Sequence, residues 1–192
     1  MIYAAIVVAC LTPLAVLIWQ WNHHQLGINS IEYVARYTGD WTLRLLLATL
    51  AVTPLRRLFA FSARYRRTLG LFAFFYGCLH LTHYVWRDKM FFWPEIWEDF
   101  RLRRFYTAGL VAFALMIPLA ATSSSAAIRR LGGRRWRMLH RLVYVSAAAG
   151  VVHYLWQGKS ILPPPVIYGG VLAVLLAARI RCCAGPRPKA LS

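Results

Sequence analysis

Apolar residues occur along the chain in long runs that short polar and basic segments separate. A helix needs about 20 mostly apolar residues to cross a bilayer, because each residue adds only about 1.5 Å along its axis. The runs therefore predict an all-α, polytopic membrane protein built as a bundle of six transmembrane helices. The expected spans cover residues 2–21, 41–55, 69–86, 105–121, 136–156 and 166–180.

The second expected span is the weakest, since it is short and contains a charge. Thr38 or Asp40 is expected to cap its start, and Pro54 is expected to end or kink it. Arg44 lies inside it, where an arginine at the membrane centre would cost about 2.5–3.5 kcal/mol on insertion scales. We expect Arg44 to lie near one end of the span and to extend its guanidinium to the membrane surface.

Most of the 23 basic side chains and all six acidic ones fall on opposite sides of the predicted membrane. The basic residues gather in segments 56–67, 129–141 and 179–189. Cytoplasmic loops carry the excess of Lys and Arg, so both termini are expected in the cytoplasm and segment 87–104 outside. Clustering between apolar runs indicates contact with anionic lipid and argues against nucleic acid as the partner.

Composition supports a membrane protein without a separate soluble domain. The chain is 59% hydrophobic and 15% charged, whereas soluble domains are about 45–50% apolar and about 25% charged. Six spans leave only short loops, which predicts one membrane domain over residues 1–181 and a short cytoplasmic tail over 182–192. The four cysteines form no C-x-x-C-H motif, which excludes a covalently attached c-type haem.

Four histidines fall inside or at the ends of the third and fifth expected spans: His80, His83, His140 and His153. Ionisable residues at membrane depth indicate function by default. The two spans run parallel, so His80 or His83 can meet His153 in the outer half of the bilayer, and His140 belongs to the inner half. Neutral imidazoles from two helices are a common way for a bundle to hold haem iron.

Neighbouring residues fit a planar macrocycle at this level. Gly77 and Gly150 each lie three residues before a candidate ligand, on the same helix face, and leave room for a flat slot. Arg44, on the outer side, is a candidate partner for a haem propionate. Clustered guanidinium groups near His140 suit a flavin phosphate or a quinone head, although membrane anchors to lipid headgroups explain them as well. These are Arg66, Arg67, Arg135, Arg137 and Arg141.

The residues alone leave other functions open. Histidines in a membrane bundle can bridge helices by hydrogen bonds, or relay protons in a transporter. An assembly anchor without a redox role is a third possibility. The pairing of two histidines at compatible depth, each with a glycine on the same face, favours haem over these alternatives.

Short motifs in a fixed order resemble the MsrQ (YedZ) family, the haem-binding membrane subunits of the bacterial periplasmic methionine sulfoxide reductase system. This family belongs to the ferric-reductase-like transmembrane group. The resemblance covers nearly the whole chain and rests on TGDW at 38–41, TPLRR at 53–57, RTLGL at 67–71, RLGGRRW at 130–136, LHRLVY at 139–144 and HYLW at 153–156. It implies b-type haem on the third and fifth helices, with His80, His140 and His153 as the family histidines. It favours His80 over His83.

The resemblance also implies a function and partners. The chain would be a non-catalytic electron-transfer subunit in the bacterial inner membrane, with haem b and flavin mononucleotide (FMN) as cofactors. Electrons would come from the quinone pool or a cytosolic flavin reductase. They would pass to a periplasmic molybdopterin-dependent reductase that repairs oxidised methionines in proteins. The chain lacks a G-x-G-x-x-G motif, which agrees with dependence on partners.

The outer segment 87–104 combines aromatic and acidic side chains. Aromatic residues are enriched in the cores of protein interfaces, which predicts contact with the periplasmic partner. An interfacial helix lying on the bilayer is an equally good explanation. The residues concerned are Phe91, Phe92, Trp93, Glu95, Trp97, Glu98 and Asp99.

Overall fold

The computed structural model describes residues 2–55, 63–157 and 164–184, and these residues are helical almost throughout. The described part of the chain contains no strand, so the expected all-α class is confirmed. The elements are α1 (Ile2–Asn22), α2 (Ser30–Leu55), α3 (Ala63–His83), the π-helical turn η1 (Tyr84–Asp88), α4 (Trp93–Leu102), α5 (Arg104–Ala121), α6 (Ser125–Leu131), α7 (Gly133–Leu139), α8 (Leu142–Trp156) and α9 (Pro164–Ala184).

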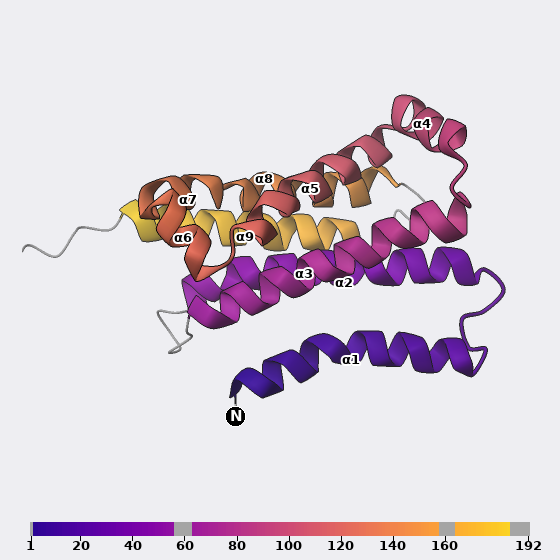
Figure 1. The fold of residues 1–192 in the computed structure, drawn as a ribbon, viewed down its shortest axis with the longest axis horizontal. Helices are drawn as coiled ribbons and strands as arrows, with labels where there is room; N and C mark the ends of the chain where they lie inside the picture. Colours follow the sequence, from indigo (N-terminus) through magenta and orange to yellow (C-terminus); the bar gives the residue numbers. More distant parts are fainter. Residues whose placement is uncertain (1, 56–62, 158–163, 185–192) are drawn as a thin grey trace, which may run out of the picture.

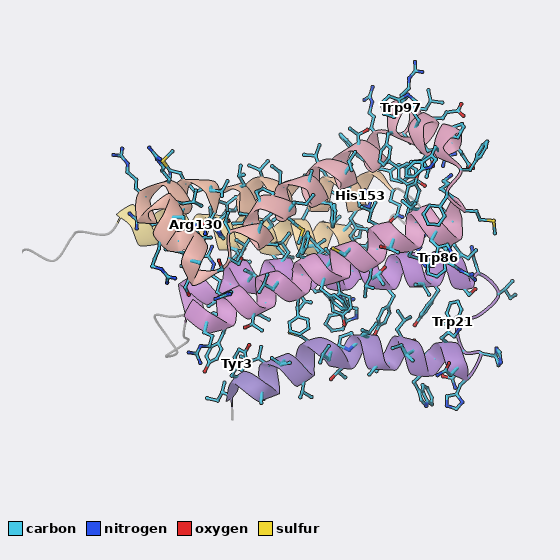
Figure 2. The ribbon with its side chains drawn as sticks, viewed as in Figure 1. Tyr3, Trp21, Trp86, Trp97, Arg130 and His153 are labelled. Carbon is cyan, nitrogen blue, oxygen red and sulfur yellow. The ribbon has the colours of Figure 1, made fainter. Side chains whose placement is uncertain are left out.

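The long helices run side by side as an elongated bundle (Figure 1). Helix α2 packs along α3, α5 packs along α8, and α9 contacts both α2 and α8. Short helices mark the two ends: α4 lies at one end, and α6 and α7 lie at the other. Figure 2 shows Arg130 at the α6 end and Trp86 and Trp97 at the α4 end. The bundle therefore has a basic end and an aromatic end, which the sequence predicts to be the inner and outer ends.

The core lies between the paired helices, where apolar side chains recur every three or four residues. On α2, Leu43, Leu46 and Leu50 follow this spacing and are buried. Ala73 on α3 and Ala147 on α8 are fully buried, with 0% exposure. Small residues at these positions let the helices approach closely, as is common in membrane bundles. This packing fixes the separation of the helices that carry the candidate ligands.

Helix α1 lies on the far side of α2 and α3 from α5 and α8 (Figure 1). Two tyrosine hydroxyls attach it: Tyr76 donates to the carbonyl of Cys10 at 2.9 Å, and Tyr37 donates to the carbonyl of Pro13 at 3.0 Å. Each hydroxyl would carry an unfavourable desolvation free energy without a partner in such surroundings. These bonds therefore tie α1 to the bundle in addition to its apolar contacts.

The expected start of the second span is wrong. Helix α2 begins at Ser30, eleven residues earlier than expected, and runs for 26 residues. Asn29 caps it, because its side-chain oxygen accepts the amide of Glu32 at 3.2 Å and its side-chain amide donates back to the Glu32 carboxylate at 2.7 Å. Thr38 lies mid-helix, where its hydroxyl donates to the carbonyl of Val34 at 2.8 Å. The described part of α2 extends to Leu55, so the expectation that Pro54 ends or kinks the helix stays a prediction.

The single fifth helix that the sequence predicts is instead two helices, α7 and α8, with His140 and Arg141 between them. Gly132, which has a positive φ of 74°, separates α6 from α7. Helix α8 has only 15 residues, so His153 lies about 16 Å from its start at 1.5 Å per residue. The third helix begins at Ala63, before the expected residue 69, and the outer segment contains η1 and α4.

Two of the described helices, Ile2–Asn22 and Arg104–Ala121, are long and apolar enough by themselves to cross a membrane. A shorter apolar stretch covers Pro165–Arg179 within α9. The expectation of six spans with both termini in the cytoplasm stays a prediction. Helix α9 continues to Ala184, past the expected start of the tail at residue 182, and the expected bounds of the membrane domain and the tail stay predictions. Residues 185–192 and the basic pair Arg56 and Arg57 lie outside the described residues.

Candidate functional site

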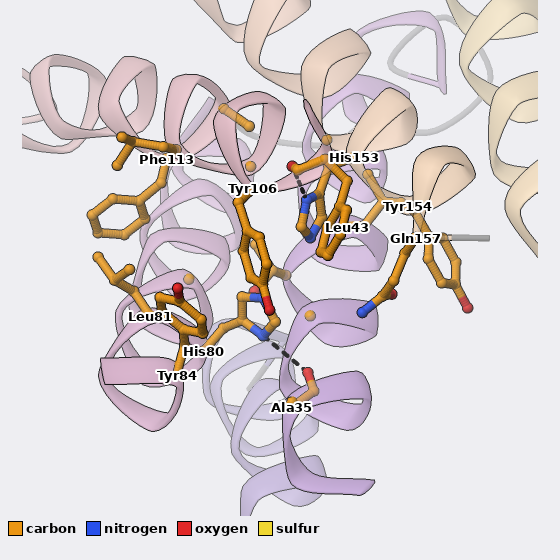
Figure 3. Close-up of a pocket in the computed structure, with 18 of the residues that line it drawn as sticks. Ala35, Leu43, His80, Leu81, Tyr84, Tyr106, Phe113, His153, Tyr154 and Gln157 are labelled. Carbon is orange, nitrogen blue, oxygen red and sulfur yellow. Dashed lines mark hydrogen bonds between the residues drawn. The ribbon is translucent and has the colours of Figure 1, made fainter. Parts of the chain in front are cut away.

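A cavity of about 680 Å³ opens between α2, α3, α5 and α8. His80 enters it from α3 and His153 from α8 (Figure 3). Binding pockets for drug-sized and cofactor-sized molecules are typically about 300–1,000 Å³. The cavity is therefore large enough for a cofactor, and it brings together two of the histidines that the sequence predicts as ligands.

The backbone of α2 fixes the protonation of His80. Its Nδ1 lies 2.9 Å from the carbonyl oxygen of Ala35, the contact marked by a dashed line in Figure 3. A carbonyl oxygen can only accept, so Nδ1 carries the proton and donates it. The lone pair of the neutral ring then resides on Nε2. A histidine whose Nδ1–H is held in this way is oriented and made more basic for metal ligation through Nε2.

His153 has the same arrangement on the opposite side of the cavity. Its Nδ1 donates to the carbonyl oxygen of Phe105 on α5, at 2.6 Å, which again leaves the lone pair on Nε2. The two rings have centroids 6.2 Å apart and planes inclined at 79°. Two imidazoles on one metal ion would place their ring centres on the order of 6 Å apart, from two bonds of about 2 Å and the ring radii.

Two histidines suit a metal that a macrocycle already holds. Among the described residues, no group of three or more His, Cys, Asp or Glu side chains could hold a metal ion alone. A porphyrin supplies the equatorial ligands itself and needs axial ligands from the protein. The cavity volume, the spacing of the rings and their tautomers fit haem iron.

His83 and His140 lie outside this arrangement. Nε2 of His83 donates to the carbonyl oxygen of Ile31 at 2.8 Å, so that nitrogen has no lone pair for a metal. His140 lies at the other end of the bundle, between α7 and α8. Its Nε2 is 3.0 Å from the hydroxyl of Thr122, and its ring stacks on Trp136 with centroids 4.0 Å apart.

Two glycines that sequence reasoning missed contact the histidine rings. A Cβ atom on Gly39 would lie 3.1 Å from Cε1 of His80, and one on Gly109 would lie 2.7 Å from Nδ1 of His153. The expected slot glycines, Gly77 and Gly150, do line the cavity. A helical glycine destabilises a helix by about 1 kcal/mol relative to alanine. Gly109 lies inside an otherwise apolar run, so the sequence contained a signal of close approach there, whereas Gly39 precedes the expected second span.

The structure does not place Arg44 at the cavity, where the sequence predicted a partner for a haem propionate. Its Nε donates to the hydroxyl of Tyr168 at 2.7 Å, and its guanidinium lies 5.1 Å from the ring centre of Trp41. Within the described chain, Arg44 is absent from the cavity lining, whereas Arg36 and Arg103 belong to it. Arg36 was missed because the sequence predicted a loop where α2 has already begun.

The arginines expected at the inner end do lie near His140. Arg66 is close enough for its charge to act on His140. Arg66 and Arg67 stand in the first turns of α3, and Arg135 and Arg137 are on α7. Exposed arginines suit contact with lipid headgroups as well as with a bound anion. All of the group except Arg66 are exposed, namely Arg67, Arg135, Arg137 and Arg141.

At the outer end, a buried ion pair supports a strongly exposed aromatic segment. Lys89 is only 8% exposed, and its Nζ lies 2.7 Å from Asp99 and 2.5 Å from Glu95. Burial by itself lowers the pKa of Lys89, but the bonds to Asp99 and Glu95 outweigh it and raise that pKa. Asp99 is 4% exposed, so it belongs to this support and not to the expected docking surface.

The outer tip itself displays large apolar side chains. Met90 and Phe91 have positive φ angles of 47° and 59°, a left-handed backbone that is uncommon for such residues. Phe91, Trp93 and Trp97 are 54%, 65% and 67% exposed. Backbone strain of this kind is typical of functional segments.

The fold and the cavity define a helical protein whose four central helices surround a pair of buried, oriented histidines. A family model described as "Ferric reductase like transmembrane component" matches residues 38–151, ending just before His153. Similar proteins cover more of the chain. A relative from Herminiimonas arsenicoxydans is 53% identical over 81% of this chain and 73% of its own length. Relatives from Rhodospirillum rubrum and Caulobacter vibrioides are 48% and 43% identical, over 92% and 94% of this chain and 86% and 87% of their own lengths.

All three relatives carry the name protein-methionine-sulfoxide reductase heme-binding subunit MsrQ. The chain therefore belongs to the ferric reductase like transmembrane family and, within it, to the MsrQ subunits. The resemblance seen in the sequence motifs is confirmed. Membership in a transmembrane family also identifies the chain as a membrane protein.

Proposed function

We propose that this chain is the transmembrane electron-transfer subunit of a methionine sulfoxide reductase system, and that it holds b-type haem between His80 and His153. The observation that carries the proposal is the matched pair of Nδ1–H bonds to Ala35 and Phe105, which leaves the lone pair on Nε2 of two histidines that line one cavity. The names of the relatives, which are heme-binding subunits, support the same cofactor. The chain itself transforms no final substrate and acts with a catalytic partner.

The residues of the cavity have separable roles in this proposal. His80 and His153 would hold the haem iron, and the backbone carbonyls keep their rings oriented and their Nε2 atoms basic. Apolar side chains from α2 and α5, such as Leu46, Phe113 and Met116, would enclose the cofactor and exclude water. Bound haem supplies reversible one-electron chemistry, and burial with neutral ligands tunes its potential.

We also propose an entry site for electrons at the inner end, where His140 lies beside Arg66. Guanidinium groups bind phosphate and carboxylate in a bidentate way, so this end suits the phosphate of FMN. A quinone head group could bind His140 by a hydrogen bond at the same place. The donor would be the quinone pool or a cytosolic flavin reductase. His140 remains a candidate ligand for a second haem in this proposal.

The proposed exit lies at the other end. Electrons would leave to a periplasmic, molybdopterin-dependent methionine sulfoxide reductase catalytic subunit, which repairs oxidised periplasmic proteins. The exposed aromatic tip around Trp93 and Trp97 supports a docking role there. The proposal includes six spans in the bacterial inner membrane, cytoplasmic termini and a single ferric-reductase-like haem-binding domain over about residues 1–181.

The decisive experiment is a reduced-minus-oxidised absorption spectrum of the purified protein in detergent. The wild type is measured beside His80→Ala and His153→Ala, with His83→Ala as a matched control on α3. We expect a b-type spectrum in the wild type and the control, and its loss in the other two variants. A folded wild type that binds no haem, even when haem is supplied, would contradict the proposal. That result would favour a proton pathway or transporter that uses the same histidines, which a transport assay in liposomes would test.

A further inference from the structure

The cavity has an apolar part and a polar part, and they lie at different depths. Deep in the bundle its lining includes Leu43, Leu46 and Met116. Helices α2 and α5 begin at the same end of the bundle (Figure 1). Toward that end the lining becomes polar and charged. That part includes Asn29, Glu32, Arg36, Asp40, Asp88, Arg103 and Gln157. A haem has the same asymmetry, because its two propionates occupy one edge of an otherwise apolar ring.

The two cationic side chains in this polar part lie next to the backbone groups that hold the histidines. Arg36 directly follows Ala35, the acceptor for His80, on α2. Arg103 precedes Phe105, the acceptor for His153, by two residues. Each side of the cavity therefore has a histidine, its carbonyl acceptor and an arginine. Arg36 is on α2 and Arg103 lies between α4 and α5, and both are on the same outer side of the two rings.

Both arginines keep hydrogen-bond donors for a further anion. Arg36 uses Nε and Nη2 on one oxygen of Glu32, at 3.1 and 2.8 Å. The contact of Arg103 with Asp99 is long, 3.4 Å from Nε. A guanidinium has five N–H donors, so these contacts do not exhaust either group. The arginine side chains are 39% and 58% exposed, which leaves them accessible from the polar mouth.

We propose that Arg36 and Arg103 form a carboxylate-binding pair at the outer mouth of the cavity, which holds the two propionates of the haem. The inference rests on the proposed haem function and adds the orientation of the cofactor to it. The nearby carboxylates of Glu32, Asp40 and Asp88 would repel propionates, so two cations are needed at this edge. A charge-assisted, bidentate bond to each propionate is the strongest contact this mouth offers.

The test compares the affinity of the full-length protein for two ligands that differ only in charge. Protein produced under haem limitation is titrated in detergent with haem and with haem dimethyl ester, in which both propionates are esterified. The variants are Arg36→Gln and Arg103→Gln. Their matched controls are Arg44→Gln, on the same helix as Arg36 but bonded to Tyr168, and Arg101→Gln, an exposed residue of α4.

We expect Arg36→Gln and Arg103→Gln each to weaken haem binding by about ten-fold or more, and the controls to change it little. The same two variants should bind the dimethyl ester as the wild type does, because the partner charge is gone. A loss that persists with the ester, or that Arg44→Gln matches, would show a structural effect and overturn the inference. Haem bound equally by wild type and all arginine variants, but lost in His80→Ala, would refute this pair alone. Failure of the wild type to bind haem would overturn the proposed function as well.

Discussion

Gly109 on α5 and the ring of His153 on α8 approach so closely that a Cβ atom on Gly109 would lie 2.7 Å from Nδ1 and 2.9 Å from Cε1. The same Nδ1 donates to Phe105, one turn earlier on α5. One short stretch of α5 therefore both holds the ring and leaves the space it occupies. The closely packed helices α5 and α8 thus hold one candidate ligand in position, and α2 and α3 do the same for His80.

Replacing Gly109 by alanine should displace the ring of His153. The added methyl overlaps the ring at a distance that real contacts do not reach, so the bond to Phe105 must break or lengthen. We expect haem content per protein to fall several-fold, although alanine favours the helix itself by about 1 kcal/mol. Haem absorbance against protein concentration measures the effect. Gly170→Ala on α9 is the control, because its Cβ would meet nothing within 4 Å; equal haem content in both variants would contradict this role for Gly109.

His140 should be separable from His80 and His153 in its effects. It lies at the inner end, bonded to Thr122 and stacked on Trp136. We expect His140→Ala to keep the spectrum assigned to the outer haem but to slow its reduction by a quinol or a reduced flavin by about ten-fold or more, the loss typical of a bond to a charged or reacting group. Stopped-flow reduction followed at the haem band provides the measurement. Loss of the outer haem itself would mean that His140 belongs to that site, and unchanged reduction would remove it from the entry route.

That His153 meets either His80 or His83 could be predicted, because it needs only helix periodicity, the rise per residue and parallel direction. The choice of His80 came from the resemblance to the family. The prediction that Arg44 lies at the cavity was wrong, because it considered the depth of Arg44 and not its neighbours on other helices. Its guanidinium donates to the hydroxyl of Tyr168 on α9, which is 124 residues away in the sequence. No local pattern contains such a contact. Gly109 carried a local signal as a glycine inside an apolar run, yet the rings that Gly39 and Gly109 contact are on other helices.

The error at the start of α2 was avoidable in part. Hydropathy placed the start of the predicted helix at Trp41, because the charged residues Glu32, Arg36 and Asp40 precede it. Yet Glu32 and Arg36 are spaced i and i+4, as on one face of a helix, and their side chains form an ion pair at 2.8 Å. The Asn29-x-x-Glu32 pattern is a capping signature that marks the true start. The break at His140 is different, since Arg141 and the flanking residues form helix readily. Trp136 on α7 donates its indole N–H to the carbonyl of Thr122 at 2.9 Å, a contact with a distant segment that no local pattern contains.

The contribution of Lys89 to the free energy of unfolding should decrease at alkaline pH. Breaking a buried ion pair by removing one partner costs about 3–5 kcal/mol, so Lys89→Met is expected to lower the unfolding midpoint in detergent clearly at neutral pH. The pKa of Lys89 is raised in the folded state, so its contribution is complete below the unfolded pKa of about 10.4 and declines as pH rises through the folded value.

The stability difference between wild type and Lys89→Met should therefore be constant near neutral pH. It should shrink above about pH 10.4, by at most about 1.4 kcal/mol per pH unit. Thermal unfolding across this pH range measures it, with Arg101→Met as an exposed control. A difference that grows with rising alkaline pH would have the wrong sign and would exclude a raised pKa for Lys89.

The exposed tip offers a test that separates a protein partner from the bilayer. Trp93 and Trp97 stand one turn apart on α4 and are 65% and 67% exposed, so they form one aromatic face. Truncating an aromatic hot spot costs about 2 kcal/mol or more, which is roughly 30-fold in affinity. We expect Trp93→Ala with Trp97→Ala to weaken capture of the periplasmic reductase subunit by at least that factor, with haem content unchanged. Trp156→Ala, 55% exposed at the end of α8, is the control. The contrary outcome has two parts. Capture of the reductase subunit would be unchanged, and a peptide of α4 that carries both substitutions would bind phospholipid vesicles more weakly than the unsubstituted peptide. That outcome would assign this face to the membrane surface.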